Sequence, residues 1–406
     1  MRFSRSTASA VLLAFVTLGA APASADDGSL VGFNEQPVGI VAASDGTTYV
    51  SDYGWSGGIH VYAQGARQPT RSIRAGHFTS SLAMTPDGTL YVAQSDGAGH
   101  GGIGVVAAGA TEVTATIPVS PGRHWLAAAP DGSLYIANPS EGTVSIVRPG
   151  KLQIDRTFQA GANPVEVAVT KDGTAFATNV DDGTVSVIPA DAQSPSHAVS
   201  VGAKAAPHGI AAAPDGTVYV ANILTNDVAV IEPGGTTVAR RIPVGRAPQE
   251  VTAGPDGTVY VTNSSDNTVS VIKDGATAVA ATLPTGKDPG RLAIRPDGAV
   301  IVANRGAKSV SIIPAALTNP AVATPSAGPA SPKGDGLGAV PGTEAGTALP
   351  AVAAGAAAVV LAGAFVLIAA LRRRRSDRIE AAHHGPAGSD MESEPPRAFS
   401  SQTIGH

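Results

Sequence analysis

The chain has 406 residues, of which 15% are charged and 4% aromatic, and its formal net charge at pH 7 is −5. A weakly acidic chain without a basic stripe lacks the electrostatic footprint of a nucleic-acid-binding protein, so we expect no nucleic-acid partner. The chain contains no cysteine, which excludes disulfides and thiol chemistry.

The first 25 residues have the pattern of a secretory signal peptide. Arg2 and Arg5 give a positive start, residues 8–21 are apolar, and Ala23, Ser24 and Ala25 form a small-residue cleavage site. We therefore expect a signal peptide over residues 1–25. An uncleaved membrane anchor is the less favoured alternative, because the apolar core is short.

Most of the mature chain consists of one repeated unit, typified by PDGTVYVTN at residues 255–263. An Asp-Gly pair, which favours a two-residue hairpin turn, precedes an alternating run with the pattern of a strand. The Asp of this pair recurs at positions 45, 87, 131, 172, 215, 256 and 297. A period in the forties, built of short strands and glycine turns, predicts a β-propeller. We expect an all-β fold over residues 26–314 with seven four-stranded blades.

The last copy of the repeat lacks a clear fourth strand, whereas an additional strand-like segment precedes the first copy. Residues 314–320 follow the third strand of the seventh copy but read poorly as a fourth strand. Residues 30–37 instead match the end of a repeat. We infer that this N-terminal segment supplies the outer strand of the last blade. It would close the ring and cover strand edges that are otherwise open.

The motif of Tyr260, Val261, Thr262 and Asn263 carries a family resemblance. Residues 30–314 resemble the YVTN family of β-propeller repeats, in a secreted and membrane-anchored bacterial form. NHL-repeat and lactonase-type propellers are related to that family. The resemblance implies the propeller fold, whereas it implies little about activity, because this fold hosts many unrelated functions.

The C-terminal quarter of the chain changes composition twice. Residues 315–350 are rich in Pro, Ala and Gly, which predicts an extended spacer. Residues 351–371 carry no charge over 21 positions and predict a transmembrane helix. The four arginines at 372–375 open a tail over 372–406 that we expect to be cytoplasmic and disordered. We reject a cell-wall sorting signal, since Leu349 and Pro350 are not followed by the Thr-Gly that it needs.

The predicted site lies on one face of the propeller. If the strands of a blade are lettered A to D from the channel outward, the D–A and B–C loops share a face. The uniform Asp-Gly turns lie on the other face, and variation on a rigid scaffold is where binding usually resides. Residues six and seven positions before each Asp begin strand A and should ring the mouth of the channel. The candidate ligand-binding residues from these positions and from the first B–C loop are Tyr53, Trp55, His124, Trp125, Glu166, His208, Glu250 and Arg291.

Each candidate also has a structural interpretation. Glu166 and Glu250 would be solvated strand starts, and the two histidines would satisfy backbone groups. Arg291 would pair with Glu250 of the neighbouring blade, and Trp125 would fill a gap between blades. The Asn that closes each strand B is interpreted as a turn residue that bonds its own backbone, and the repeated Asp as structural rather than metal-binding.

Three hypotheses about function follow. The first is a non-catalytic surface module in the cell membrane, with an extracellular propeller that binds a wall-associated ligand or protein through the varied face. It needs no cofactor, and its ectodomain would be monomeric. The alternative is a lactonase- or lyase-like enzyme that uses Glu166 and Glu250 with a histidine, with or without a divalent ion. A third hypothesis is a sensor or assembly subunit that passes a state across the membrane to a partner.

Overall fold

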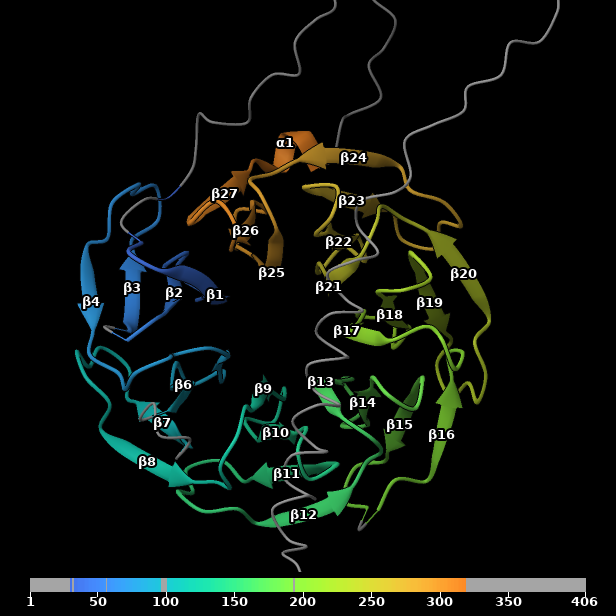
Figure 1. Cartoon of the computed structure of the whole chain (residues 1–406), viewed down its shortest axis with the longest axis horizontal. Coiled ribbons are helices and arrows are strands. Elements are labelled where there is room, and N and C mark those ends of the chain that lie inside the picture. The colour runs from blue at the N-terminus through green and yellow to red at the C-terminus, as the bar shows by residue number, and fades with distance from the viewer. Residues whose placement is uncertain (1–29, 31–32, 56, 96–100, 193, 319–406) are drawn as a thin grey trace, which may run out of the picture. The chain divides into compact units, whose positions relative to one another are not determined.

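The computed structural model describes residues 30, 33–55, 57–95, 101–192 and 194–318. All of these residues belong to the first of two compact units, Met1–Ser326. They form 27 strands and one short helix, arranged as seven antiparallel sheets in a ring (Figure 1). The predicted all-β, seven-bladed propeller is thereby confirmed.

Each blade runs outward from its innermost strand, in chain order. Blades one to four comprise β1(Gln36–Ala42), β2(Thr48–Tyr53), β3(Gly58–Tyr62) and β4(Arg71–Ile73); β5(Leu82–Met84), β6(Leu90–Ser95), β7(Gly101–Val106) and β8(Ala115–Pro118); β9(Trp125–Ala128), β10(Leu134–Asn138), β11(Thr143–Val147) and β12(Arg156–Gln159); β13(Pro164–Val169), β14(Ala175–Asn179), β15(Thr184–Ile188) and β16(His197–Ser200). Blades five to seven comprise β17(Pro207–Ala212), β18(Val218–Asn222), β19(Asp227–Ile231) and β20(Arg240–Pro243); β21(Pro248–Ala253), β22(Val259–Asn263), β23(Thr268–Ile272) and β24(Ala281–Pro284); β25(Pro289–Ile294), β26(Val300–Asn304) and β27(Ser309–Ile313).

The Asp-Gly turns repeat the same geometry in all seven blades. Each Asp accepts the N–H of the residue two positions on, as Asp256 does from Thr258 at 3.0 Å. Each Gly has φ between 77° and 90°, which only glycine adopts without strain. A two-residue Asp-Gly turn needs positive φ at both residues, and the Asp residues do not have it. In blade six the turn instead has three loop residues, 255–257, closed by the hydrogen bond from the Gly254 N–H to the Thr258 carbonyl. The predicted two-residue hairpin was therefore wrong.

The seventh blade is completed from the other end of the chain. Its sheet has three strands, β25 to β27, and Leu30 pairs antiparallel with Val310 of β27. The Leu30 N–H donates to the Val310 carbonyl at 2.8 Å, and the Leu30 side chain is fully buried. This pairing supports the predicted closure of the ring by the N-terminal segment.

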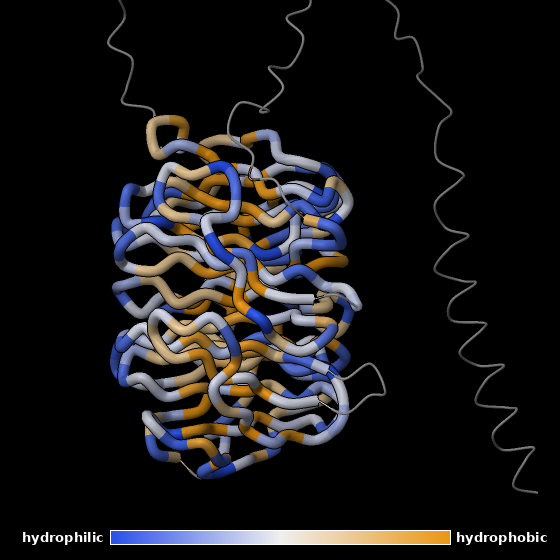
Figure 2. Tube along the Cα trace, turned by 90° about the vertical axis from the view of Figure 1, so that its left-hand side faces the viewer, coloured by the Kyte–Doolittle hydropathy of each residue, from blue (hydrophilic) through white to orange (hydrophobic). Residues whose placement is uncertain are grey.

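The core lies between neighbouring blades. Every adjacent pair shares one cluster of buried hydrophobic side chains, including blades seven and one, where Leu30 and Ile40 pack with Ile301. Figure 2 shows the ring edge-on, with hydrophilic turns towards its two faces and hydrophobic strands between them. The alternating strand pattern of the repeat therefore buries one apolar layer after another around the ring.

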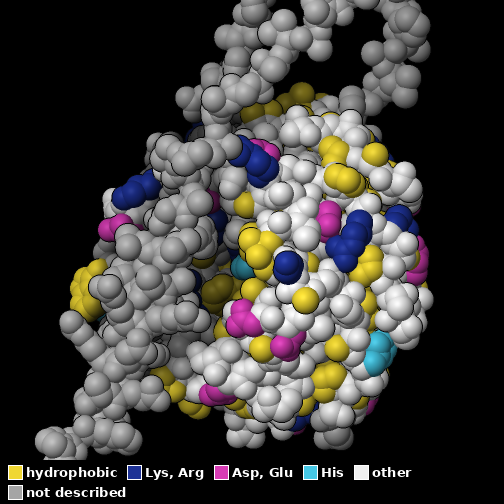
Figure 3. Space-filling view, turned by 45° about the vertical axis from the view of Figure 1, so that its right-hand side comes forward, with side chains coloured by type: hydrophobic (Ala, Val, Ile, Leu, Met, Phe, Trp, Pro, Cys, Tyr) yellow, Lys and Arg dark blue, Asp and Glu magenta, His cyan; other side chains and the backbone are white. Residues whose placement is uncertain are grey.

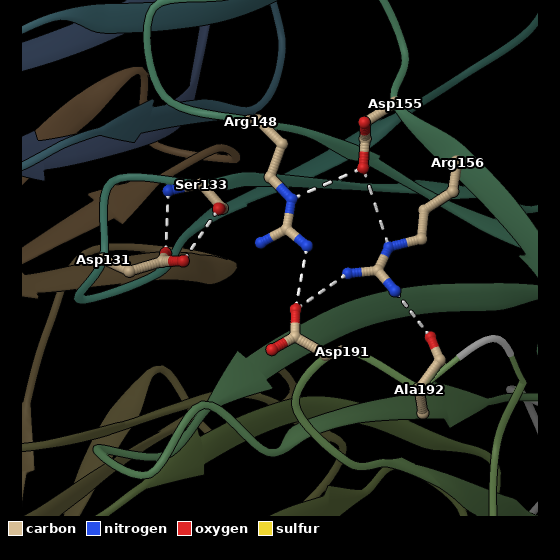
Figure 4. A network of polar contacts seen from close by, with 7 residues as sticks. All are labelled: Asp131, Ser133, Arg148, Asp155, Arg156, Asp191 and Ala192. Carbon is tan, nitrogen blue, oxygen red and sulfur yellow. Dashed lines mark hydrogen bonds and ion pairs between the residues drawn. The ribbon is translucent and has the colours of Figure 1, made fainter.

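Polar contacts add to this packing on the Asp-Gly face. Between blades three and four, Arg148 lies 2.9 Å from Asp191, and Arg156 donates to the Ala192 carbonyl at 2.8 Å (Figure 4). Arg71 of blade one reaches the Ala110 carbonyl of blade two in the same way, at 2.7 Å. In blades one and three, the arginine that begins strand D thus links its blade to the C–D turn of the next.

The chain leaves the propeller through α1(Ala315–Thr318). Residues 315–318, expected to open the spacer, form this short helix, and Thr318 is buried with its carbonyl 2.9 Å from the Lys273 amine of blade six. No helix among the described residues is long and apolar enough to cross a bilayer. The predicted signal peptide, the rest of the spacer, the membrane span and the tail lie outside the described residues.

Candidate functional site

The inner strands begin with an irregular register that exposes polar residues to the channel. In blades one, four, five, six and seven, a Pro is the first or second residue of strand A, and the pairing with strand B shifts directly after it. Proline has no N–H for the ladder, and the shift leaves two residues outside the regular pairing. Glu166, His208, Glu250 and Arg291 all occupy this irregular stretch.

These side chains surround a cavity of about 210 Å³. It brings together six of the eight predicted residues, one from each of six blades: Tyr53, Trp125, Glu166, His208, Glu250 and Arg291. Its other lining residues are Gln36, Val38, Ser80, Ser81, Arg123, Gln249, Gly290 and Arg305. Apart from Val38, Gly290 and the two aromatic rings, the wall is polar or charged.

A charged triad occupies one side of the cavity. Arg291 of blade seven forms an ion pair with Glu166 of blade four, and its Nε lies 3.7 Å from the Glu250 carboxylate of blade six. Both carboxylate side chains are less than 10% exposed, so they are not solvated strand starts. The predicted pairing of Arg291 with Glu250 is present, and the contact with Glu166 is the shorter one.

Burial determines the protonation of this triad. It raises the pKa of Glu166 well above its usual range, Arg291 opposes the rise, and the Glu250 charge adds to it. Burial likewise raises the pKa of Glu250 against the opposing charge of Arg291. Two buried carboxylates that share one guanidinium therefore favour uptake of a proton.

His208, which lines the same cavity as the triad, is neutral. Burial, with the nearby Arg291 charge as a smaller cause, lowers the pKa of His208 from 6.5 to about 4. Its Nδ1 lies 3.0 Å from the Gln249 carbonyl, which can only accept, so Nδ1 carries the proton and Nε2 is an acceptor. The expectation that a histidine satisfies a backbone group is met at this residue.

The other side of the cavity is aromatic. The Arg123 guanidinium lies 5.1 Å from the Tyr53 ring centroid and 5.8 Å from that of Trp125. Tyr53, Ser80 and Arg123 also line a second hollow of about 360 Å³, so they separate two concave spaces. Trp125 faces the cavity and Arg123 rather than only filling a gap between blades.

Trp55 and His124 lie outside the central cavity. Trp55 is 64% exposed, and its ring stacks on His77 at 4.7 Å and meets Phe78 edge-on at 5.8 Å. Phe78 in turn contacts Tyr53 at 5.5 Å, so an aromatic track leads from the exposed Trp55 to the cavity wall. His124 is buried, with its two ring nitrogens 2.8 Å from Asn138 and from the Ser120 carbonyl, which is a structural role.

The Asn residues that close strand B were misinterpreted as turn residues. They are buried, and none has positive φ. In blade six the Asn263 amide donates to the hydroxyls of Thr268 and Ser270 on strand C, at 3.0 and 2.9 Å. The corresponding bonds recur in blades three, four and seven. The YVTN Asn therefore joins strands B and C within the blade.

Sequence reasoning missed Arg123 and Arg305. Arg123 stands one position before the register that was searched, and Arg305 directly follows the last strand-B Asn. No other copy of the repeat has an arginine at either position. A search for charged residues that covered one more position at each of these places would have found them. Arg305 pairs with Asp288 at 2.8 Å.

The residues present do not fit a divalent ion between the two carboxylates. The Arg291 guanidinium already stands there, and among the described residues no group of three or more His, Asp or Glu side chains could hold a metal. A cation at this point would have to displace Arg291 from both glutamates. Elsewhere on the ring, Figure 3 shows basic and acidic side chains interspersed on the visible side.

Fold and site together define a seven-bladed propeller with a polar cavity at one mouth of its channel. The model of the virginiamycin B lyase family matches residues 110–318, more than half of the chain. The chain belongs to the virginiamycin B lyase family. The resemblance to YVTN-type propellers is confirmed at this level.

Solved structures support the fold. The chain is 13% identical to a catalytically inactive His-to-Ala variant of virginiamycin B lyase from Staphylococcus aureus with quinupristin, at a TM-score of 0.58, over 70% of this chain and 96% of that one. Kuenenia stuttgartiensis hydrazine synthase is 19% identical at a TM-score of 0.62, over 70% and 97%. No curated protein sequence matches.

Proposed function

We propose that this protein binds a ligand, without transforming it, at the channel mouth and the adjoining loop face. The observation that carries the proposal is the cavity to which six blades each contribute a predicted site residue. A concave site with a few convergent polar groups is the usual form of a small-molecule site.

The charges of the cavity favour binding over catalysis. Burial raises the pKa of Glu166 and Glu250, but Arg291 stands between the two carboxylates, so a substrate would have to displace the guanidinium to use either one as a base. His208 is the one histidine in the cavity wall, and a pKa of about 4 makes it a weak base at neutral pH. Effective general bases have pKa values near the working pH.

Retention of cell-wall glycan fragments by the immobilised full-length chain tests the proposal. The Trp125→Ala variant should lose retention, because Trp125 forms part of the cavity wall. Trp55→Ala should weaken it if the ligand extends along the aromatic track. Leu152→Ala, an exposed position on the Asp-Gly face, is the control. Unchanged retention in Trp125→Ala would contradict this site.

A second candidate function is a lyase, and two observations favour it. The chain belongs to a family named for a lyase, and a related structure is a His-to-Ala variant that is inactive. In this chain the histidine at the cavity is His208, with Nε2 free to accept a proton. Incubation with quinupristin, followed by chromatography, distinguishes the candidates. Conversion by the wild type that is lost in His208→Ala would establish the lyase and remove the first proposal.

We also propose that the propeller is held outside the cell membrane by residues 351–371. The support is the sequence alone: a long uncharged run followed by four arginines. In whole cells, added protease should degrade the propeller and spare an epitope placed in residues 376–406. Protection of the propeller in intact cells would reverse the topology.

A further inference from the structure

The three arginines of the cavity differ in their partners. Arg291 is paired with Glu166 and Glu250, and Arg305 with Asp288. Arg123 has no carboxylate partner among the described residues; its recorded neighbours are the rings of Tyr53 and Trp125. An arginine is the residue best suited to bind a carboxylate in two parallel hydrogen bonds.

Arg123 is also placed for binding. The two rings attract the guanidinium and limit its rotation, so less conformational entropy remains to be lost when an anion binds. Arg123 lines both the central cavity and the second hollow, which contains Phe78 and Gln94. A group bound to Arg123 therefore has room to extend on either side.

The wall of the central cavity selects the rest of the ligand. Gln36, Gln249, Ser80 and Ser81 present amide and hydroxyl groups, and Glu166 presents a carboxylate. Glu166, Ser80 and Ser81 already have partners in the protein, whereas no partner is seen for the side-chain amides of Gln36 and Gln249 among the described residues. A ligand without hydrogen-bonding groups would desolvate these two amides without replacing their hydrogen bonds to water, which is costly. Hydroxyl groups both donate and accept, so they satisfy amides, hydroxyls and carboxylates alike.

We propose that the cavity binds a sugar acid, with its carboxylate on Arg123 and its hydroxyl-rich ring in the central cavity. This inference rests on the proposed binding function and names its ligand class. A carboxylate suits Arg123 because its two oxygens match two parallel N–H groups of one guanidinium, so that Arg123 alone satisfies it.

A matched pair of probes tests the role of the charge. The methyl glycoside of galacturonate and its methyl ester differ by one charge but share the ring and its hydroxyls. Titration calorimetry on the full-length wild type should show the acid binding about tenfold tighter than the ester, as expected for one charge-assisted contact. Arg123→Ala should lose this preference, and Arg123→Lys should keep part of it, since the charge remains without the planar fork.

Arg246→Ala is the control protein. Arg246 precedes a strand A on the same face and is 69% exposed, but it does not line the cavity. It should bind both probes as the wild type does. Equal binding of acid and ester by the wild type, or a preference retained in Arg123→Ala, would overturn the inference.

The outcomes separate this inference from the proposed function. Wall fragments retained through Trp125, together with no binding of the galacturonate glycoside, would overturn the sugar-acid assignment and leave the binding function intact. Conversion of quinupristin by His208 would overturn the binding function itself. A preference for the acid that depends on Arg123 would support both.

Discussion

The two sides of the channel mouth are built differently. Blades four to seven contribute Glu166, His208, Glu250 and Arg291, which all stand at the same shifted start of strand A, and Arg291 pairs with both carboxylates. Blades one to three contribute Tyr53, Arg123 and Trp125, which come from less regular segments and contact an exposed aromatic track.

The difference separates two tasks. On the side of blades four to seven, the charged side chains pair with one another within the protein. Their effect therefore falls mainly on the stability of the fold and on its pH dependence. On the side of blades one to three, Arg123 has no carboxylate partner among the described residues, and we propose that it binds the ligand. The repeat supplies a uniform backbone, and function is expected where side chains or loops depart from it.

The largest expected effect comes from removing the shared cation. Arg291→Leu leaves two buried carboxylates unpaired and should cost about 3–5 kcal/mol of unfolding free energy at pH 8. Arg291 lowers the pKa of both glutamates, so both pKa values rise further without it. Stability is then lost as pH rises through the raised pKa values, and urea unfolding should show partial recovery at pH 5.

A triple variant serves as the control for this prediction. Replacing Glu166, Glu250 and Arg291 with Leu, Leu and Met removes all three charges, and its stability should approach that of the wild type. A cost in the triple variant equal to that of Arg291→Leu would assign the loss to packing rather than to charge.

His208 should give the next largest effect on the unfolding free energy, with the opposite dependence on pH. Its pKa is lowered in the folded protein, so it contributes stability above pH 6.5 that is lost as pH falls towards about 4. The loss should reach about 3 kcal/mol at most. His208→Gln should flatten the unfolding free energy over this range. An unchanged slope would show that the imidazole protonates freely in the folded state.

Replacing the Asn that closes strand B allows a direct comparison of stability between the two sides. Asn138 of blade three donates to Thr143 and Ser145 and contacts His124, whereas the side-chain amide oxygen of Asn263 in blade six has no hydrogen-bond partner among the described residues. Asn138→Ala should therefore cost about 1 kcal/mol more than Asn263→Ala. Equal melting shifts would mean that the His124 contact adds nothing.

Trp55 should show the smallest effect on stability. Because the ring is 64% exposed, Trp55→Ala should change the unfolding free energy by no more than about 0.5 kcal/mol. A measurable loss of ligand retention with unchanged stability would assign the aromatic track to binding. A large loss of stability would make the track part of the scaffold.

The sequence was sufficient for the architecture. The regularly spaced Asp-Gly pairs predict the number of blades, because each repeat forms one sheet and packs only on its neighbours. The surplus at residues 30–37 predicted the pairing seen between Leu30 and Val310. The register before each Asp-Gly pair also pointed to the channel, since strand A occupies the same place in every blade.

Only the closed ring decided which of these residues meet. Glu166 and Arg291 are 125 positions apart, and no local pattern relates them. Closure brings the strand starts of blades four, six and seven around one cavity, where burial forces opposite charges together. In the same way, His124 turns to Asn138 and away from the central cavity, while the neighbouring Arg123 lies over the rings of Tyr53 and Trp125, where we propose that it binds the ligand.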